Sequence, residues 1–326
     1  MRKSRILGTG SELAENKVSN RDLAKIVDTN DEWIVSRTGI ETRYFASPET
    51  STSGLATKAA KKALEAAGID AADIDLIIVA TITPDMGFPA TACLVQEQIG
   101  AVKAAAFDLE AACSGFIYGM AVADQFISTG FYNHVLVIGA ETMSRILDMK
   151  DRNTCVLFGD GAGAVVMGPA EGDNHIKSFH LGADGSGGKF LYMPAGGSKM
   201  PSSHETVDNR LHFVKMGGTD VFKFAVRTME SSSITAVEKA GLEVNQIDYM
   251  VPHQANIRII QAAAKKLNLP MEKVQVNLNH YGNMSAASIP VALDEAFREN
   301  KFKKDDHVLL VGFGAGLTWA SCVIKW

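Results

Sequence analysis

Short apolar runs alternate with amphipathic segments along the first half of the chain. Runs of about four to eight apolar residues predict buried strands, and apolar positions that recur every three or four residues predict helices. The expected strands cover 5–8, 74–81, 104–109, 134–139 and 163–168, and the expected helices lie near 52–67, 90–99 and 115–129. This alternation predicts an α/β fold.

The second half of the chain repeats the pattern at an almost constant offset. Residues 67–70 are echoed by 240–243, and residues 134–139 by 307–312, each 173 positions later. A third echo, near the N-terminus, has an offset of 174. A fixed internal period predicts two copies of one structural unit.

We therefore expect two α/β halves, residues 1–172 and 173–326, packed over one shared core. The offset places Cys113 on Ala286, so each half has a corner of small side chains at the same point of the repeat. The first half would supply a cysteine to a shared site, and the second half a histidine and an asparagine.

Other segments of the chain are expected to surround that site. Active sites of α/β proteins gather where strands end, and residues 251–256 and 312–316 directly follow expected strands. Residues 20–50 and 183–220 have no counterpart in the repeat. We interpret these two segments as insertions that cover the site.

Composition and charge exclude several classes of protein. A net charge of −5 over 326 residues gives no basic field for nucleic acid. The four cysteines are widely spaced and the histidines lack metal-ligand spacing, so neither a disulfide framework, a zinc site nor any other metal site is expected. The N-terminus does not read as a signal peptide, and no apolar run reaches the roughly 18 residues of a membrane span. We expect a soluble, cytoplasmic protein.

Cys113 is the first candidate for chemistry. It lies at a tight corner between an expected strand and an expected helix. A thiol at the first turn of a helix is exposed to the positive end of the helix dipole, which predicts a pKa lowered toward neutrality and a nucleophilic thiolate. The alternative interpretation is a small buried packing residue.

His253 and Asn283 become candidates for function only when they are considered together with such a thiolate. Taken alone, His253 reads as a structural histidine and Asn283 as a turn residue. In one site with Cys113, neutral imidazole and amide groups are suitable donors to a developing enolate. Backbone N–H groups of Cys113 and of the glycine-rich stretch 312–316 would form an oxyanion hole.

Several motifs, taken as a set, resemble the β-ketoacyl-acyl carrier protein synthase III family. They are residues 31–40, 111–116, 158–164, 253–258 and 281–283, and the similarity runs from end to end. The resemblance implies the thiolase fold, in which two duplicated α/β halves form a five-layered α-β-α-β-α core. It also implies a homodimer.

The resemblance further implies the roles of residues in the reaction. Cys113 would be the acylated nucleophile, and His253 and Asn283 would stabilise the enolate formed when a malonyl thioester loses carbon dioxide. Ala315 would give the second oxyanion donor through its backbone, and Phe313 would line the site. Phe88 would reach the acyl pocket of the partner subunit.

Substrate contacts are implied in the same way. Trp33 and Arg152 would hold the adenine of coenzyme A between them, Arg37 would lie near its phosphates, and Asn256 would contribute to the same site. The alternative interpretation of Trp33 is a structural residue that anchors its helix in the hydrophobic core.

A basic helix follows His253. Arg258, Lys265 and Lys266 lie on it, with the first two on one face. The resemblance implies that this face docks an acidic acyl carrier protein. The alternative is an ordinary solvated basic face.

Two positions depart from the family pattern. Ala315 stands where glycine is familiar, which is tolerable if the backbone there does not need a positive φ. Met284 follows Asn283 where threonine is common. Its larger side chain would add bulk beside the Asn283 amide, which predicts a change in substrate preference or in rate.

These observations predict a condensing enzyme that initiates type II fatty acid synthesis. Cys113 would take a short acyl group from acyl-coenzyme A, and a malonyl-acyl carrier protein would then condense with it to give a 3-oxoacyl-carrier protein. Coenzyme A enters as a substrate, and no resident cofactor is expected. Alternatives are a related acyltransferase for a polyketide or signalling product, and a non-catalytic binding module. A dehydrogenase is excluded because the glycine-rich stretches lack the dinucleotide-binding context.

Overall fold

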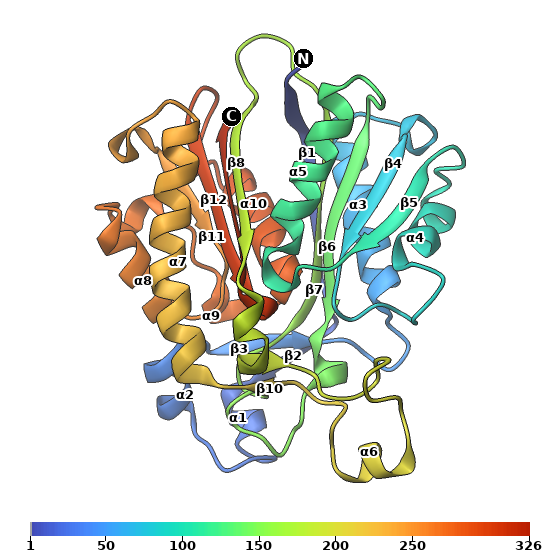
Figure 1. Ribbon diagram of the computed structural model, residues 1–326, viewed down its shortest axis with the longest axis vertical. Helices are drawn as coiled ribbons and strands as arrows, with labels where there is room; N and C mark the ends of the chain where they lie inside the picture. Colours follow the sequence, from blue (N-terminus) through green and yellow to red (C-terminus); the bar gives the residue numbers. More distant parts are fainter. Residues whose placement is uncertain (1) are drawn as a thin grey trace.

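The computed structural model describes residues 2–326 as five stacked layers of helices and sheets (Figure 1). Helices α3 (Thr52–Ala67) and α4 (Thr91–Ile99) form one outer layer, and α7 (Gly218–Lys239) and α8 (Ile257–Lys266) form the other. Two sheets lie inside them, and helices α5 (Gly115–Ser128) and α10 (Ser288–Arg298) fill the centre. The expected five-layered α-β-α-β-α architecture is confirmed.

The first sheet has five strands in the order β1-β7-β6-β4-β5. Their bounds are β1 (Ser4–Leu13), β4 (Leu76–Ala80), β5 (Ala105–Leu109), β6 (Val135–Thr142) and β7 (Asp160–Pro169). Strands β5, β4 and β6 run parallel, and β1 and β7 complete the sheet in antiparallel pairs. Every residue of β4 and β6 is buried, as expected of parallel strands that are covered on both faces.

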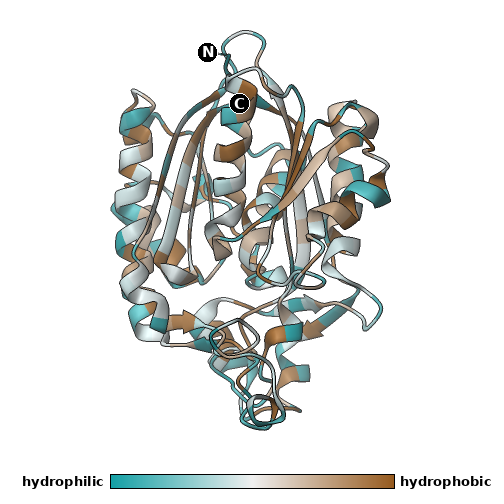
Figure 2. Cartoon of the chain, turned by 45° about the vertical axis from the view of Figure 1, so that its right-hand side comes forward, coloured by the Kyte–Doolittle hydropathy of each residue, from teal (hydrophilic) through white to brown (hydrophobic). Residues whose placement is uncertain are grey.

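The second sheet has the order β11-β12-β13-β8. Its strands are β8 (Ile176–Ala183), β11 (Tyr249–Pro252), β12 (His307–Gly314) and β13 (Thr318–Lys325). An isolated parallel bridge between Met250 and Val274 extends it beyond β11. Figure 2 shows hydrophobic colour along the strands of both sheets, while the hydrophilic colour lies mainly on the outer helices and loops.

Elements of the two sheets correspond in order and in chain position. Helix α10 begins 173 residues after α5, and the 3₁₀ turns that precede them, Ala112–Ser114 and Ser285–Ala287, have the same offset. Ala112 and Ser285, which open these turns, both have a φ of 46°. The corner that carries Cys113 therefore has a backbone counterpart in the second half.

The two insertions lie at one end of the molecule (Figure 1). The first forms β2 (Asn16–Ser19), α1 (Asn20–Leu23), α2 (Asp31–Thr38) and β3 (Thr42–Phe45). The second forms β9 (Leu191–Tyr192), α6 (His204–Asp208) and β10 (Lys215–Met216). The short helix α9 (Leu278–Tyr281) packs against β3 at the same end.

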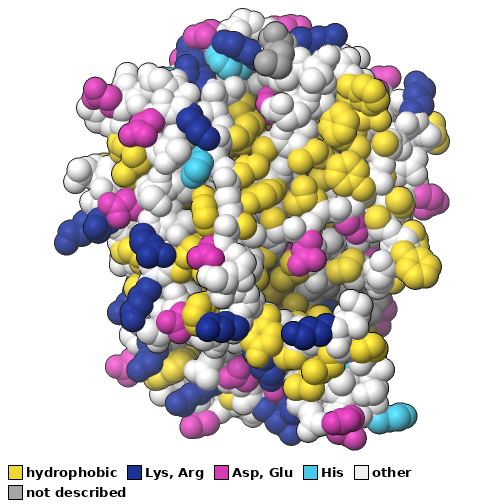
Figure 3. Space-filling model, in the orientation of Figure 1, with side chains coloured by type: hydrophobic (Ala, Val, Ile, Leu, Met, Phe, Trp, Pro, Cys, Tyr) yellow, Lys and Arg dark blue, Asp and Glu magenta, His cyan; other side chains and the backbone are white. Residues whose placement is uncertain are grey.

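Strand β5 forms an edge of the first sheet. Phe107 on this strand is 36% exposed, and Phe88, on the loop that follows β4, is 88% exposed. Figure 3 shows hydrophobic side chains gathered on this side of the molecule. An exposed strand edge next to apolar side chains is a surface that proteins commonly cover.

Within residues 2–326, no helix combines the length and the apolar character that a membrane crossing requires.

Candidate active site

Cys113 lies in the 3₁₀ turn between β5 and α5, where it is only 6% exposed. Ala112 before it takes a positive φ, which turns the chain sharply and directs the thiol toward the second half of the molecule. The sulfur contacts the hydroxyl of Ser285, with 3.6 Å between Sγ and Oγ. The two equivalent turns thus meet at the centre of the molecule.

The expectation of a lowered thiol pKa is wrong for this geometry. Burial raises the pKa of Cys113 to about 12, and the negative charge of Glu141 adds to the increase, while the hydrogen bond to Ser285 opposes it. The helix dipole alone predicts a lower pKa, whereas desolvation of the thiolate acts in the opposite direction and depends on burial, which the sequence does not show. The free thiol is therefore protonated, and it needs a proton acceptor before it can attack.

His253 follows β11 directly and is 1% exposed. Its backbone N–H donates to the carbonyl of Val311 at 2.8 Å, and its ring packs edge-on against Phe313 with 5.4 Å between ring centroids. Burial lowers the pKa of His253 to about 3, so the imidazole is neutral near pH 7. Among the described residues its Nδ1 has no hydrogen-bond partner.

Asn283 is held by backbone and side-chain hydrogen bonds. Its N–H donates to the carbonyl of Leu157 at 2.9 Å, and its own carbonyl accepts from Gly159 at 3.0 Å. Its side-chain oxygen accepts from the N–H of Ser285 at 2.8 Å. Because the oxygen is engaged in this bond, the amide is oriented with its NH₂ group as the donor to an incoming ligand.

A buried cavity of about 100 Å³ brings these side chains together. Its lining includes Cys113, His253, Asn283, Asn256 and Phe313. The sequence predicted all five as site residues, although they come from distant parts of the chain. Its remaining walls are mainly apolar and include side chains that sequence reasoning missed: Leu157, Leu191, Met216, Val221, Phe222, Phe224 and Leu317.

Gly314 packs closely against the turn that carries the nucleophile. A Cβ atom at this position would lie 2.7 Å from the backbone nitrogen of Cys113 and 3.0 Å from the Cβ of Ala112. Because contacts this short leave no room for a side chain, glycine allows the end of β12 to approach the backbone of Cys113.

The two departures from the family pattern are explained by the geometry. Ala315 does not have a positive φ, because that conformation is taken by Gly316 and Leu317 instead, at 72° and 48°. The side chain of Met284 is fully buried in a cluster with Leu13, Tyr281, Ala287 and Val291, and it does not line the cavity. The concern that Met284 crowds the amide of Asn283 is therefore unsupported.

Trp33, Arg37 and Arg152 form one group. The guanidinium carbons of Arg37 and Arg152 lie 4.6 Å and 5.2 Å from the centre of the Trp33 ring. The side chain of Asn256 donates to the carbonyl of Arg37 at 2.9 Å, which links the group to the cavity wall. Trp33 is half-buried and also packs against the core beneath it, so both interpretations of this residue have a structural basis.

The basic residues on α8 are exposed but differ in their contacts. Arg258 lies 5.7 Å from the ring of Phe222, which lines the cavity. Lys266 pairs with Glu230 on α7 at 3.6 Å. Of the residues predicted to dock a carrier protein, Arg258 is thus the one linked through Phe222 to the cavity.

Two residues that were predicted for the oxyanion hole and the acyl pocket do not line the cavity. Phe88 is exposed, and Ala315 adjoins the lining residue Gly314 without lining the cavity itself. The exposure of Phe88 agrees with a side chain that extends toward another subunit.

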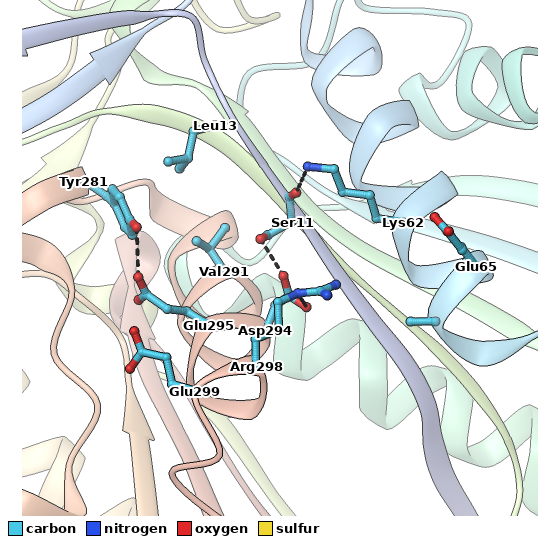
Figure 4. A pocket seen from close by; sticks show the side chains of 11 residues that line it. Ser11, Leu13, Lys62, Glu65, Tyr281, Val291, Asp294, Glu295, Arg298 and Glu299 are labelled. Carbon is cyan, nitrogen blue, oxygen red and sulfur yellow. Dashed lines mark hydrogen bonds and ion pairs between the residues drawn. The ribbon is translucent and has the colours of Figure 1, made fainter.

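A second, wider groove of about 730 Å³ lies between β1, α3 and α10 (Figure 4). Its polar groups bond mainly to one another: Ser11 donates to Asp294 at 2.6 Å, and Tyr281 donates to Glu295 at 2.8 Å. None of the predicted site residues lines it. The smaller cavity is therefore the candidate site.

Comparisons with known proteins agree on one family. Residues 107–185 match the profile described as 3-oxoacyl-[acyl-carrier-protein (ACP)] synthase III, and residues 237–326 match that of its C-terminal part. The chain is 60% identical over 98% of its length to the β-ketoacyl-[acyl-carrier-protein] synthase III of Caldanaerobacter subterraneus, 97% of which is covered.

The fold of this chain is also similar to that of solved structures over nearly its full length. The 3-oxoacyl-[acyl-carrier-protein] synthase III of Aquifex aeolicus superposes with a TM-score of 0.92 at 47% identity, over 99% of this chain and all of that one. A priming β-ketosynthase from the R1128 polyketide biosynthetic pathway also gives 0.92, at 37% identity, over 99% of this chain and 96% of that one.

Proposed function

The chain belongs to the 3-oxoacyl-[acyl-carrier-protein] synthase III family, and we propose on this basis that Cys113, His253 and Asn283 are its catalytic residues. It is an acyl-transferring condensing enzyme that initiates fatty acid synthesis. One observation carries the residue assignment: a thiol, a neutral imidazole and an oriented amide line one buried cavity. The nucleophile comes from the proposed half 1–172, and the other two residues come from 173–326.

In the first step, the sulfur of Cys113 attacks the carbonyl carbon of a short acyl-coenzyme A. The carbonyl oxygen becomes negatively charged, and in this proposal the N–H groups of Cys113 and Ala315 donate to it. Coenzyme A then leaves. The cavity that Cys113 lines is small, about 100 Å³, which favours a short acyl group.

In the second step, malonyl-acyl carrier protein enters and loses carbon dioxide. The electron pair left behind forms an enolate, whose oxygen is stabilised by hydrogen bonds from His253 and Asn283. Both groups are neutral, and such donors suit an apolar cavity because no unpaired charge is buried in the resting enzyme. The enolate carbon attacks the Cys113 thioester, and the 3-oxoacyl product leaves on the carrier protein. Phe313 packs against His253 and limits the cavity.

We propose that the group formed by Trp33, Arg37 and Arg152, together with Asn256, binds coenzyme A. Arg152 now lies over the Trp33 ring at 5.2 Å, so in this proposal its guanidinium moves away from the ring and adenine stacks between the two, while Arg37 adds positive charge for phosphate. The hydrogen bond from Asn256 to Arg37 fixes this group relative to the cavity.

The carrier protein docks on α8 in this proposal. Arg258, Lys265 and Lys266 form an exposed basic face beside the cavity wall. Complementary charges of this kind accelerate association with an acidic partner.

We further propose a homodimer whose subunits meet along the β5 edge, with Phe88 of each subunit reaching toward the acyl pocket of the other. The exposed aromatic side chains of Phe88 and Phe107 support this arrangement. The proposed reaction uses coenzyme A thioester as substrate and calls for no resident cofactor. We place the enzyme in the cytoplasm, which agrees with four free thiols at Cys93, Cys113, Cys155 and Cys322.

The similarity to a polyketide priming enzyme favours one alternative, namely that the chain supplies starter units to another acyl-carrier system. Presenting the acylated enzyme with malonyl-carrier protein from fatty acid synthesis and with malonyl-carrier protein from a polyketide pathway separates the two functions. Rapid condensation with the fatty acid carrier protein supports the main proposal. Exclusive use of the polyketide carrier protein would favour the alternative.

A further inference from the structure

Glu141, at the end of β6, is a fully buried carboxyl group that the reaction described above does not use. Its oxygens accept hydrogen bonds from the hydroxyls of Thr83 and Thr81 at 2.5 Å and 3.2 Å, and from the N–H of Ile82 at 3.2 Å. The N–H of Ala286 points at it from 3.4 Å. Burying a carboxyl group is costly, and this one lies where the two halves meet.

The repeat gives this position a precise counterpart. Glu141 corresponds to Gly314 at the offset of 173, and Ala286 corresponds to Cys113. In the second half, Gly314 has no side chain, and its backbone packs closely against the backbone nitrogen of Cys113. In the first half, the carboxyl group of Glu141 stands at the equivalent position of the repeat and accepts from the N–H of Ala286. The first half thus carries a carboxyl group at a position where the second half has none.

Ser285 connects this carboxyl group to the nucleophile. The thiol of Cys113 donates to the Ser285 hydroxyl at 3.6 Å, and the residue after Ser285 directs its backbone N–H at Glu141 from 3.4 Å. The Ser285 side chain lies near enough to Glu141 to lower the pKa of that carboxyl group. Ser285 therefore stands between the sulfur and a buried acid.

We propose that Ser285 and Glu141 form a proton relay that accepts the Cys113 proton during acylation and returns it during condensation; this inference rests on the proposed function. As sulfur attacks the acyl carbon, its proton moves to the Ser285 oxygen and the Ser285 proton moves to Glu141. Coenzyme A leaves as a thiolate and takes a proton from solvent. When the enolate later displaces Cys113, the thiolate recovers the proton from Glu141 through Ser285. One proton is thus consumed per turnover, as the overall reaction requires.

The pKa values of the groups in the site favour proton transfer from Cys113 to Glu141. Burial raises the pKa of the Cys113 thiol to about 12 and lowers that of the His253 imidazole to about 3, so His253 is a poor acceptor. Burial raises the pKa of Glu141 to about 7, against the lowering effect of its hydrogen bonds. A base with a pKa near the working pH is well suited to proton transfer.

Few other ionisable groups surround Glu141. Its partners on the loop after β4 are hydroxyls and one amide, and those in the turn before α10 are the Ser285 hydroxyl and the Ala286 amide. In the turn before α5, the titratable neighbour is Cys113. Asp160 on neighbouring β7 bonds instead to Ala46 and Ser144. Asp160 therefore provides a matched control, as a second buried carboxyl group outside the relay.

The test is rapid-quench acylation of the full-length enzyme by acetyl-coenzyme A between pH 5.5 and 9, followed by intact mass. Glu141→Gln keeps the shape of the side chain but cannot act as the base, and Ser285→Ala interrupts the relay while keeping the backbone N–H that holds Asn283. We expect each variant to acylate about 100-fold more slowly, to lose the rise in rate around pH 7, and still to reach one acyl group per chain. The full acylation amplitude shows that the variant is folded.

Asp160→Asn should keep the parental pH profile. Parental rates and pH profile in folded Ser285→Ala would overturn the relay even if Glu141→Gln failed to fold, and the proposed function would remain intact. Failure of the parental enzyme to become acylated would instead contradict the proposed function.

Discussion

The side-chain oxygen of Asn283 accepts a hydrogen bond from the backbone N–H of Ser285 at 2.8 Å. This bond orients the side-chain amide. Its oxygen is bonded to Ser285, so its NH₂ group remains as the donor to a ligand in the cavity. The turn Ser285–Ala287 thus orients the side chain of Asn283, which precedes it by two residues. The same turn carries the hydroxyl that contacts Cys113.

Asn283→Asp tests this donor. Aspartate keeps the acceptor for the Ser285 N–H but replaces the donor with an oxygen, which would repel the enolate. We expect malonyl decarboxylation and condensation to fall at least 100-fold, while acylation of Cys113 by acyl-coenzyme A continues. Release of labelled carbon dioxide and intact mass measure the two steps. Unchanged decarboxylation would show that Asn283 is not a donor to the enolate.

Burial of His253 predicts a dependence of stability on pH. Because the folded-state pKa is about 3, below the usual 6.5, the unfolded chain binds this proton first as the pH falls. His253 therefore costs the folded state stability below pH 6.5, by about 3 kcal/mol at pH 4.5. Urea unfolding of the parent and of His253→Gln across this range should show the parent losing more stability as the pH falls. Parallel pH profiles would contradict a buried neutral imidazole.

Trp33→Ala tests the adenine site. Loss of the aromatic face should raise the KM for acyl-coenzyme A about tenfold, since a stacked cation and ring contribute roughly 1–2 kcal/mol. Acylation at saturating substrate should change little. An acyl-pantetheine substrate, which lacks the adenine, provides the control. Equal losses with both substrates would show that Trp33 acts as a core anchor.

Arg258→Glu tests carrier-protein docking. Reversing this charge beside the cavity wall should raise the KM for malonyl-carrier protein about tenfold at low salt, and the difference should shrink as salt screens the charges. Lys61→Glu, on the outer face of α3, makes the same change of charge in the opposite outer layer and should have little effect. If both variants lose activity equally, net charge rather than docking is responsible.

Much of the site could be predicted because the repeat provides geometry as well as a pattern. The offset of 173 pairs the corner of Cys113 with that of Ala286, and a duplicated α/β unit brings such corners together. His253 was expected in the same place because it directly follows a strand. These three positions depend on periodicity and chain order, which the sequence contains.

Other properties of the site depend on how deeply a side chain is buried and on where it points. The sequence does not contain this information. The acidity of Cys113 is set by how far the thiol is desolvated, and a helix-dipole argument has no information on burial. The sequence predicts added bulk from Met284 beside the amide, but its side chain packs with Leu13 and Tyr281 and does not line the cavity. The link from Cys113 to Ser285 and Glu141 joins residues far apart in the chain and has no sequence signature.

The central claim is that the thiol of Cys113 carries the acyl group while separate neutral donors handle the malonyl unit. Intact-mass measurement after incubation with short straight and branched acyl-coenzyme A species tests it most directly, in the parent and in Cys113→Ala. We predict one acyl group per parental chain and none on the variant, with slow malonyl decarboxylation retained by the variant. An acylated or condensing Cys113→Ala enzyme would contradict the account.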